Sequence, residues 1–215
     1  MACFVNRTIL AALIALLLAP LSSMAPAAAA TTRILAFGDS LTAGLGLATD
    51  QSFPAQLAAR LKADGYDVIV DNGGVSGDTT TDGLARFDWT MGDHPDVVLL
   101  ELGANDMLRG LAPAKAAANL DAMLGKLKAA KVKVLLLGMR APPNWGIDYQ
   151  KSFDAIYPML AKKYDVPLYP FFLDGVALDP KLNQPDGLHP TAAGVAVIAG
   201  RIAPAVERLL GKPVE

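Results

Sequence analysis

The fold is decided by residues 33–46, "RILAFGDSLTAGLG", in which a short apolar run ends on a cluster of turn-forming residues. The run "RILAF" is typical of a buried strand, and Gly38, Asp39 and Ser40 follow it directly. In open α/β sheets, functional groups gather outside the carboxyl ends of the strands. If this run is the first strand of such a sheet, the Ser40 hydroxyl lies at the edge where chemistry takes place.

Further apolar runs repeat the pattern: "YDVIV" (66–70), "DVVLLEL" (96–102), "KVKVLLLG" (131–138) and "VPLYPF" (166–171). Longer amphipathic segments alternate with them and predict helices over 53–65, 112–131 and 190–210, the first capped by Ser52. Such alternation requires right-handed crossovers and a parallel sheet covered on both faces. We therefore expect one α/β domain, a three-layer αβα sandwich, over residues 31–215. The helix residues at core-facing spacing are Phe53, Leu57, Leu61, Leu120, Leu124, Leu127, Val195, Ile198, Ile202 and Val206.

Residues 1–30 are typical of a cleavable secretory signal peptide. Arg7 precedes the apolar run "ILAALIALLLA" (9–19), and alanines at 28–30 supply the small residues that signal peptidase requires. The run is shorter than the about 20 residues that a membrane-spanning helix needs. We expect cleavage before Thr31 and a periplasmic or secreted mature chain without stable membrane insertion; an uncleaved N-terminal anchor is the alternative.

The composition excludes several classes of protein. With 215 residues, 53% of them hydrophobic, the chain can bury one sizeable core. Without residues 1–30 it has 18 basic and 21 acidic residues, a net charge of −3, which excludes a basic surface for nucleic acid. The single cysteine, Cys3, lies in the predicted signal, so the mature chain has no thiol, disulfide or cysteine metal site. We expect a monomer.

The two histidines have different settings. His94, in "GDHPD" (92–96), precedes the third predicted strand, at the end remote from the crevice, and we expect an exposed loop residue. His189 follows Asp186 by three residues in "PDGLHP" (185–190), a turn that can hold the carboxylate against the imidazole. This leaves His189 as the candidate general base and excludes a histidine zinc cluster. An ordinary loop ending in a helix cap is the alternative.

Two more polar segments follow predicted strands. "VSGDTT" (75–80) contains Gly77 and "LGANDMLRG" (102–110) contains Asn105, and both should face the same crevice as Ser40. Taken singly, these segments have a purely structural alternative, because polar residues after a strand commonly cap the next helix. The candidate caps are Ser40, Asp78, Thr79, Asn105 and Asp106.

Taken together, these residues supply the parts of an acyl-transfer site. A serine hydroxyl needs a base to remove its proton, and the base needs an acid to fix its tautomer; Ser40, His189 and Asp186 fit these roles. Attack on an ester carbonyl creates an oxyanion, which needs donors at about 2.7 to 3.1 Å. The candidate donors are the backbone N–H groups of Ser40 and Gly77 and the side-chain amide of Asn105.

The blocks "GDSL", "SGDT", "GAND" and "DGLHP", in this order, resemble those of the SGNH, or GDSL, hydrolases. The segments "VSGDTTTDGLARF", "LELGANDMLRG" and "AIYPMLAKKYDVPLYPFF" resemble the periplasmic acyl-CoA thioesterase, lysophospholipase and arylesterase branch. The resemblance implies a flavodoxin-like sheet of five parallel strands and hydrolysis of carboxylic esters or thioesters without metal or cofactor. It also implies Ser40 as nucleophile, His189 as base, Asp186 as its partner, and Gly77 and Asn105 in the oxyanion hole.

Apolar residues after the third and fourth strands are candidates for binding the acyl part of a substrate, although they could equally pack these loops onto the sheet. They are Met107, Leu108, Leu111, Pro142, Trp145, Ile147 and Tyr149. A groove of this kind discriminates weakly between chain lengths, because one methylene is worth about 1 to 3 kcal/mol. Two other functions stay open: a carbohydrate O-acetylesterase, and a non-catalytic module that binds anions at helix N-termini.

Overall fold

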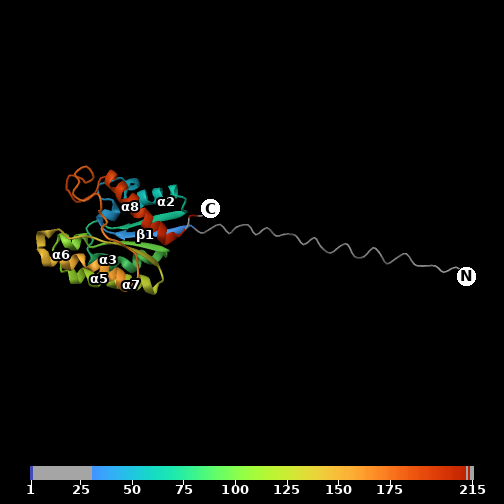
Figure 1. Ribbon diagram of the computed structural model, residues 1–215, viewed down its shortest axis with the longest axis horizontal. Coiled ribbons are helices and arrows are strands. Elements are labelled where there is room, and N and C mark those ends of the chain that lie inside the picture. The colour runs from blue at the N-terminus through green and yellow to red at the C-terminus, as the bar shows by residue number, and fades with distance from the viewer. Residues whose placement is uncertain (2–30, 212, 214–215) are drawn as a thin grey trace.

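A parallel sheet of five strands forms the middle of the protein (Figure 1). The computed structural model describes residues 1, 31–211 and 213 of the chain. The strands are β1 (Thr32–Gly38), β2 (Val68–Gly74), β3 (Val97–Glu101), β4 (Lys133–Leu137) and β5 (Leu168–Tyr169). Their order across the sheet is β2-β1-β3-β4-β5, and neighbouring strands are parallel. This is the flavodoxin-like order, so the expected sheet is confirmed.

Helices cover both faces of the sheet. They are α1 (Ser40–Ala43), α2 (Phe53–Ala63), α3 (Thr80–Thr90), α4 (Ala104–Leu108), α5 (Pro113–Ala129), α6 (Ile147–Asp154), α7 (Ile156–Tyr164) and α8 (Ala192–Leu210), with short 3₁₀ turns η1 (Thr49–Gln51), η2 (Met91–Asp93) and η3 (Pro143–Trp145). Figure 1 shows α2 and α8 on one face and α3, α5 and α7 on the other. Within the layers, α2 packs against α8, and α5 packs against α3 and α7. The three-layer αβα architecture is confirmed.

The core lies between the sheet and its two helical layers. Because helices cover both faces, the central strand β3 has no polar face, and Val97, Val98, Leu99 and Leu100 have no exposed surface. All ten helix residues that the spacing assigns to the core are buried as well. Burial of one such side chain is worth about 1.5 to 3 kcal/mol, so these apolar faces hold the strand ends in fixed positions.

Strand β2 is longer than its apolar run predicts. The run ends at Val70, but the strand continues to Gly74 and stays paired with β1 throughout. Because β2 lies at an edge of the sheet, its backbone can pair while the side chains of Asp71 and Asn72 remain partly exposed. The extension carries the chain to the edge of the sheet where β1 ends.

Helix α2 begins without the serine cap that the sequence predicts, so that prediction is wrong. Ser52 stands at the N-cap position, but its hydroxyl donates to the carbonyl of Thr49 at 2.8 Å and makes no bond to the helix. The chain enters α2 from the turn η1, which supplies this acceptor. Pro54 in the first turn has no N–H group, which leaves one donor fewer to satisfy.

The predicted signal peptide spans residues 1–30, of which residues 2–30 lie outside the described residues, and it stays a prediction. Within residues 31–211, no helix combines the length and the hydropathy that crossing a bilayer requires. The buried apolar side chains of this part of the chain form one cluster.

Candidate active site

Ser40 is the first residue of the single-turn helix α1, two residues after the end of β1. The cap of this helix is Asp39, whose Oδ1 accepts the backbone N–H of Leu41 at 3.0 Å. The Ser40 hydroxyl is therefore not used as a cap, contrary to the structural alternative. Ser40 is buried, at 8% exposure, and its Oγ lies 2.9 Å from Nε2 of His189.

The loop before α8 places His189 against this hydroxyl. Nδ1 of His189 lies 2.6 Å from Oδ2 of Asp186, while Oδ1 of Asp186 accepts the backbone N–H groups of Leu188 and His189 at 2.9 and 3.0 Å. These backbone donors, the one from His189 first, lower the pKa of Asp186 to about 2. Asp186 is thus ionised at neutral pH, and it orients Nε2 of the ring toward Ser40.

A glutamine fastens this loop to the segment after α1. Nε2 of Gln184 donates to the carbonyls of Leu45 at 2.8 Å and Pro190 at 3.0 Å. The backbone N–H of Gln184 donates to the carbonyl of His189 at 2.7 Å. These bonds help to hold Ser40 and His189, which are 149 positions apart in the chain, at hydrogen-bond distance.

The loop after β2 and the start of α4 bring Gly77 and Asn105 to the same edge. Gly77 has φ +89°, a backbone conformation that favours glycine. Over residues 31–211, the backbone N–H groups of Ser40 and Gly77 have no hydrogen-bond acceptor within the protein. Both groups can therefore donate to a bound oxyanion.

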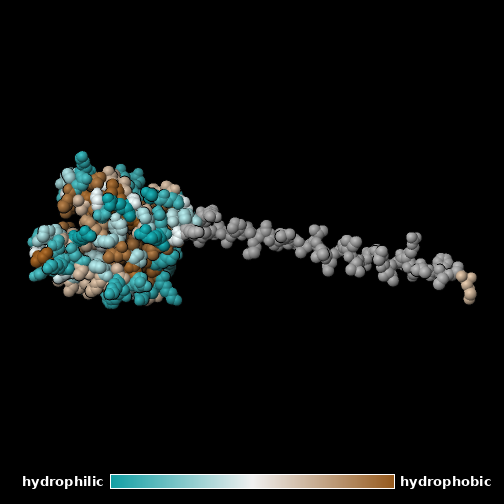
Figure 2. Space-filling model, viewed as in Figure 1, coloured by the Kyte–Doolittle hydropathy of each residue, from teal (hydrophilic) through white to brown (hydrophobic). Residues whose placement is uncertain are grey.

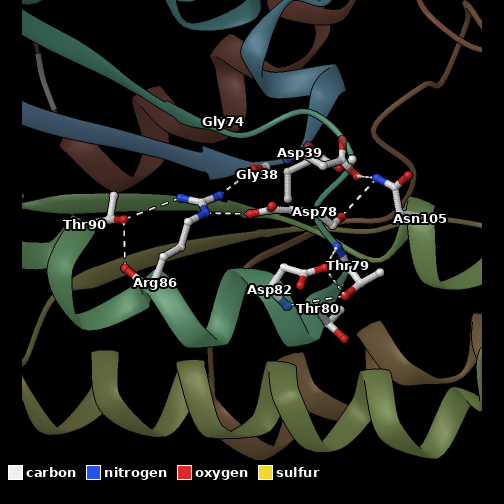
Figure 3. Close-up of polar contacts among 12 residues, drawn as sticks. Gly38, Asp39, Gly74, Asp78, Thr79, Thr80, Asp82, Arg86, Thr90 and Asn105 are labelled. Carbon is white, nitrogen blue, oxygen red and sulfur yellow. Dashed lines mark hydrogen bonds and ion pairs between the residues drawn. The ribbon is translucent and has the colours of Figure 1, made fainter.

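The amide of Asn105 already has two acceptors. Its Nδ2 donates to the carbonyl of Asp78 at 3.0 Å and to Oδ2 of Asp39 at 3.2 Å (Figure 3). These bonds orient the amide. An oxyanion that binds Nδ2 would have to share it with Asp39 or replace that longer bond. The role of Asn105 as an oxyanion donor stays a prediction.

The capping alternatives for the other loops are settled by the hydrogen bonds. Gly103, not Asn105, stands at the N-cap of α4, while the carboxylate of Asp106 accepts the N–H and the hydroxyl of Thr80, both at 2.7 Å. Thr79 does cap α3, in a reciprocal arrangement with Asp82. The structural interpretation is thus correct for Thr79 and wrong for Asn105.

A fully buried glutamate, which sequence reasoning missed, lies behind the Ser40 turn. Oε2 of Glu101 accepts the hydroxyl of Thr42 at 2.8 Å and the N–H of Asp39 at 3.3 Å, and Oε1 has no partner among the described residues. Gly38 allows this approach, because a Cβ there would collide with the Glu101 side chain. Burial, then the nearby Asp39 charge, raises the pKa of Glu101 well above its ordinary value; burial also raises the pKa of Asp39 to about 6.

The Glu101→Gln variant should unfold less readily than the wild type at high pH. The folded protein keeps a proton on Glu101 that the unfolded chain releases above the ordinary pKa of 4.5. The free energy of unfolding of the wild type therefore falls by up to about 1.4 kcal/mol per pH unit as the pH rises from 4.5 toward the raised pKa of the folded state. Glutamine carries no such proton. Urea unfolding across this pH range should show that the gain in free energy of unfolding of Glu101→Gln over the wild type shrinks toward acid pH. Glu207→Gln on α8 is the control. A gain that does not depend on pH would contradict this interpretation of Glu101.

The candidate substrate-binding residues lie in two segments that pack against each other, one that begins in α4 and one that ends in α6, so they are not confined to loops. Nε1 of Trp145 donates to the carbonyl of Met107 at 2.8 Å, and the hydroxyl of Tyr149 donates to the carbonyl of Leu111 at 2.9 Å. Trp145 and Tyr149 therefore have a structural role as well. Met107 and Tyr149 are half-buried, and the remaining members are exposed: Leu108, Leu111, Pro142, Trp145 and Ile147.

Apolar surface also lies on the other side of the site. Figure 2 shows hydrophobic surface at the end of the molecule that carries α6 and the loop before α8. In that loop Leu178 is 93% exposed and Leu188 is 47% exposed. These two leucines were not predicted as site residues, because no strand ends beside them.

His94 lies far from these residues, as expected. It is exposed at the amino end of β3 and lines a surface cavity of about 800 Å³ with Thr31, Asp96 and Lys133. Among the described residues, no three histidine, cysteine or carboxylate side chains gather in a way that could hold a metal ion.

Comparison with known proteins gives a consistent result. Residues 36–197 match the model of the GDSL-like lipase/acylhydrolase family. Esterase TesA of Pseudomonas aeruginosa is 42% identical over 85% of this chain and 91% of its own. Thioesterase 1/protease 1/lysophospholipase L1 of Escherichia coli is 41% identical over 85% of this chain and 87% of its own.

A solved structure is similar to this chain in fold as well as in sequence. The crystal structure of AlinE4, an esterase of the SGNH-hydrolase family, is 48% identical, covers 86% of this chain and 100% of its own, and superposes with a TM-score of 0.72. The residues that match the family model include β2, β3, β4 and β5, the last three residues of β1, and all four polar segments at the edge of the sheet. The chain therefore belongs to the GDSL-like lipase/acylhydrolase family.

Proposed function

We propose that this protein is a serine esterase that hydrolyses carboxylic ester or thioester bonds of acyl substrates through an acyl-enzyme intermediate. The observation that carries the proposal is the continuous path from Asp186 to His189 to Ser40, with distances of 2.6 and 2.9 Å. It ends at a buried hydroxyl that has no other partner among the described residues. A hydroxyl held in this way can be deprotonated as it attacks a carbonyl carbon.

The proposed reaction has two halves. In the first, Oγ of Ser40 attacks the carbonyl carbon while Nε2 of His189 takes its proton, and the N–H groups of Ser40 and Gly77, with Asn105, stabilise the oxyanion. His189 then protonates the leaving alcohol or thiol, and the acyl group remains on Ser40. In the second half His189 activates a water molecule, which releases the acid and restores Ser40. No step uses a metal or a cofactor.

The proposed substrates are aryl esters, acyl thioesters and lysophospholipids. The names of the relatives support this range, since they include an esterase and a thioesterase/lysophospholipase. The exposed apolar residues beside the site, Leu108, Leu111 and Ile147, suit an acyl chain. Such surfaces separate chain lengths by only about 1 to 3 kcal/mol per methylene, so we expect broad specificity.

We also propose that the protein acts in the periplasm or outside the cell, as a monomer without stable membrane insertion. The apolar run at 9–19 and the alanines at 28–30 support export. Amino-terminal sequencing of the exported protein should begin at Thr31. A retained residue 1–30 segment would instead support the anchor.

The substrate class is tested with p-nitrophenyl acetate, butyrate and palmitate, with and without a chelator. The proposal predicts hydrolysis of all three that the chelator does not affect. Hydrolysis of acetate and of acetylated xylan, but not of palmitate, would favour a carbohydrate O-acetylesterase. No turnover of any ester, together with calorimetric binding of a phosphate ester, would favour the anion-binding module.

The Asn105→Ala variant tests the oxyanion site. Removal of one oxyanion donor typically lowers kcat by about 10²- to 10³-fold, and we expect a loss of this size with KM changed much less. Steady-state kinetics with p-nitrophenyl butyrate measure both parameters. An unchanged kcat with a raised KM would make Asn105 a substrate-binding residue instead.

A further inference from the structure

An arginine outside the proposed triad contacts two of the segments that carry the oxyanion donors. Arg86, on α3, donates from Nε to Oδ2 of Asp78 at 2.6 Å and from Nη2 to the carbonyl of Gly38 at 2.8 Å (Figure 3). Its guanidinium also lies over the ring of Phe37, 4.1 Å from the centroid. One planar group thus contacts the end of β1 and the loop after β2 at the same time.

This ion pair is unlike the others in the described structure. The side chains of Arg86 and Asp78 are 19% and 12% exposed, whereas each other arginine or lysine pair has at least one side chain that is 40% exposed or more. Removing two charges from water costs several kcal/mol, which close and well-oriented contacts must offset. Surface pairs are worth about 0 to 1 kcal/mol and are easily lost, so this buried pair is a more specific feature.

The contacts of Arg86 connect all three candidate oxyanion donors. The carbonyl of Gly38 lies two residues before Ser40, and Asp78 follows Gly77 directly. The backbone carbonyl of Asp78 in turn accepts the amide of Asn105 at 3.0 Å. The pair formed by Arg86 and Asp78 therefore fixes the spacing between the segment that carries Ser40, the loop that carries Gly77, and the Asn105 side chain.

We propose that Arg86 is a positioning residue that, through Asp78 and Gly38, holds the oxyanion donors in their working geometry. This inference rests on the proposed function, because it assigns a role within the same site. Arg86 itself makes no hydrogen bond to Ser40 or His189, so its effect passes through the two backbone segments. A displacement of about 1 Å in such a site can cost about 10²-fold in rate.

The planar shape of the group matters as much as its charge. Arg86 uses two different nitrogens, Nε and Nη2, for its two acceptors. Lysine presents one ammonium group at the end of a flexible stem and cannot reproduce this fork. The inference therefore predicts that Arg86→Lys, which keeps the charge, restores only part of the activity lost in Arg86→Gln.

The test compares kcat and KM of Arg86→Gln and Arg86→Lys for p-nitrophenyl butyrate. Arg60→Gln is the matched control, because Arg60 forms an exposed pair with Asp64 on α2, away from the site. We expect kcat of Arg86→Gln to fall by about 10- to 100-fold with KM within about threefold of the wild type, a smaller loss for Arg86→Lys, and no change for Arg60→Gln. Titration of reactive serine with a fluorophosphonate counts the folded active sites, so a lower rate per site is separated from unfolding.

Three results would overturn the inference: kcat per active site that matches the Arg60→Gln control, a loss confined to KM, or full activity of Arg86→Lys. Asp78→Asn adds an independent check. Because both residues act as one unit, the double variant Arg86→Gln/Asp78→Asn should lose no more kcat than the worse single variant. Failure of the proposed function itself is distinguishable, because Ser40→Ala would then keep its activity whatever Arg86 does.

Discussion

Replacement of Ser40 by alanine is expected to lower kcat for p-nitrophenyl butyrate by about 10⁶-fold, the size of loss that removal of a serine nucleophile causes in other hydrolases. The reason is chemical. The Ser40 hydroxyl has one hydrogen-bond partner among the described residues, Nε2 of His189, so its removal takes away the attacking atom and little else. The fold should therefore persist, with a melting temperature close to that of the wild type.

The matched control for this variant is Ser152→Ala. The hydroxyl of Ser152 donates to the carbonyl of Asp148, one turn earlier in α6, and has no contact with the triad. Its removal should leave kcat unchanged. The double variant Ser40→Ala/His189→Ala should be no slower than Ser40→Ala alone, because the two groups act as a unit. Hydrolysis by Ser40→Ala at more than a tenth of the wild-type rate would refute the nucleophile assignment.

The Asp186→Asn variant is expected to lower kcat by about 10⁴-fold, because an amide at this position holds the histidine in the wrong tautomer. Asp186 accepts hydrogen bonds from two backbone N–H groups, and its Oδ2 faces Nδ1 of His189. Asparagine can keep one set of these contacts but cannot carry the negative charge that stabilises the imidazolium. Steady-state kinetics of Asp186→Asn measure this effect. Asp174→Asn is the control, because Asp174 is an exposed residue that pairs with Arg201.

The acid range gives a second measurement on Asp186. Backbone N–H donors lower its pKa to about 2, so the stability that its contacts provide is present above the ordinary pKa of 3.8 and is lost only as the pH falls toward 2. Any fall in kcat/KM at a pH above the ordinary pKa of 3.8 must therefore come from the titration of another group. A variant Asp186→Asn whose activity matches the wild type at neutral pH would contradict the role of this carboxylate.

Much of the fold could be predicted from the sequence, because strands buried on both faces are recognisable as continuous apolar runs. The run at 96–102 gave β3 almost residue for residue. The edge strand β2 was harder, since its last residues are polar and pair only through the backbone. Helices α3, α6 and α7 were not predicted individually; α6 in particular has few residues that reach the core, Phe153 being its buried member.

The polar edge of the sheet was predictable for a similar reason. Ser40, Gly77 and Asn105 follow the ends of β1, β2 and β3, and parallel topology brings those ends together. His189 and Asp186 were found from their spacing in a turn.

The supporting residues were not predictable in this way. Glu101 is visible as one acid in an apolar run, but its neighbours Asp39 and Thr42 come from the N-cap of α1 and from α1 itself, which follow another strand. Arg86 stands among ordinary helix residues, and its partner Asp78 is eight positions away on a loop. Contacts of this kind depend on how β1, β3 and α3 meet, which local sequence does not specify.

The most direct test of whether Ser40 forms the acyl-enzyme is to measure the mass of the protein after reaction with a fluorophosphonate and then to locate the adduct by peptide mapping. We expect one adduct per chain, located on Ser40, and a loss of ester hydrolysis in proportion to the labelled fraction. Chelators should not alter the labelling. An adduct on another residue, or full hydrolysis by protein labelled on Ser40, would contradict the claim that Ser40 forms the acyl-enzyme.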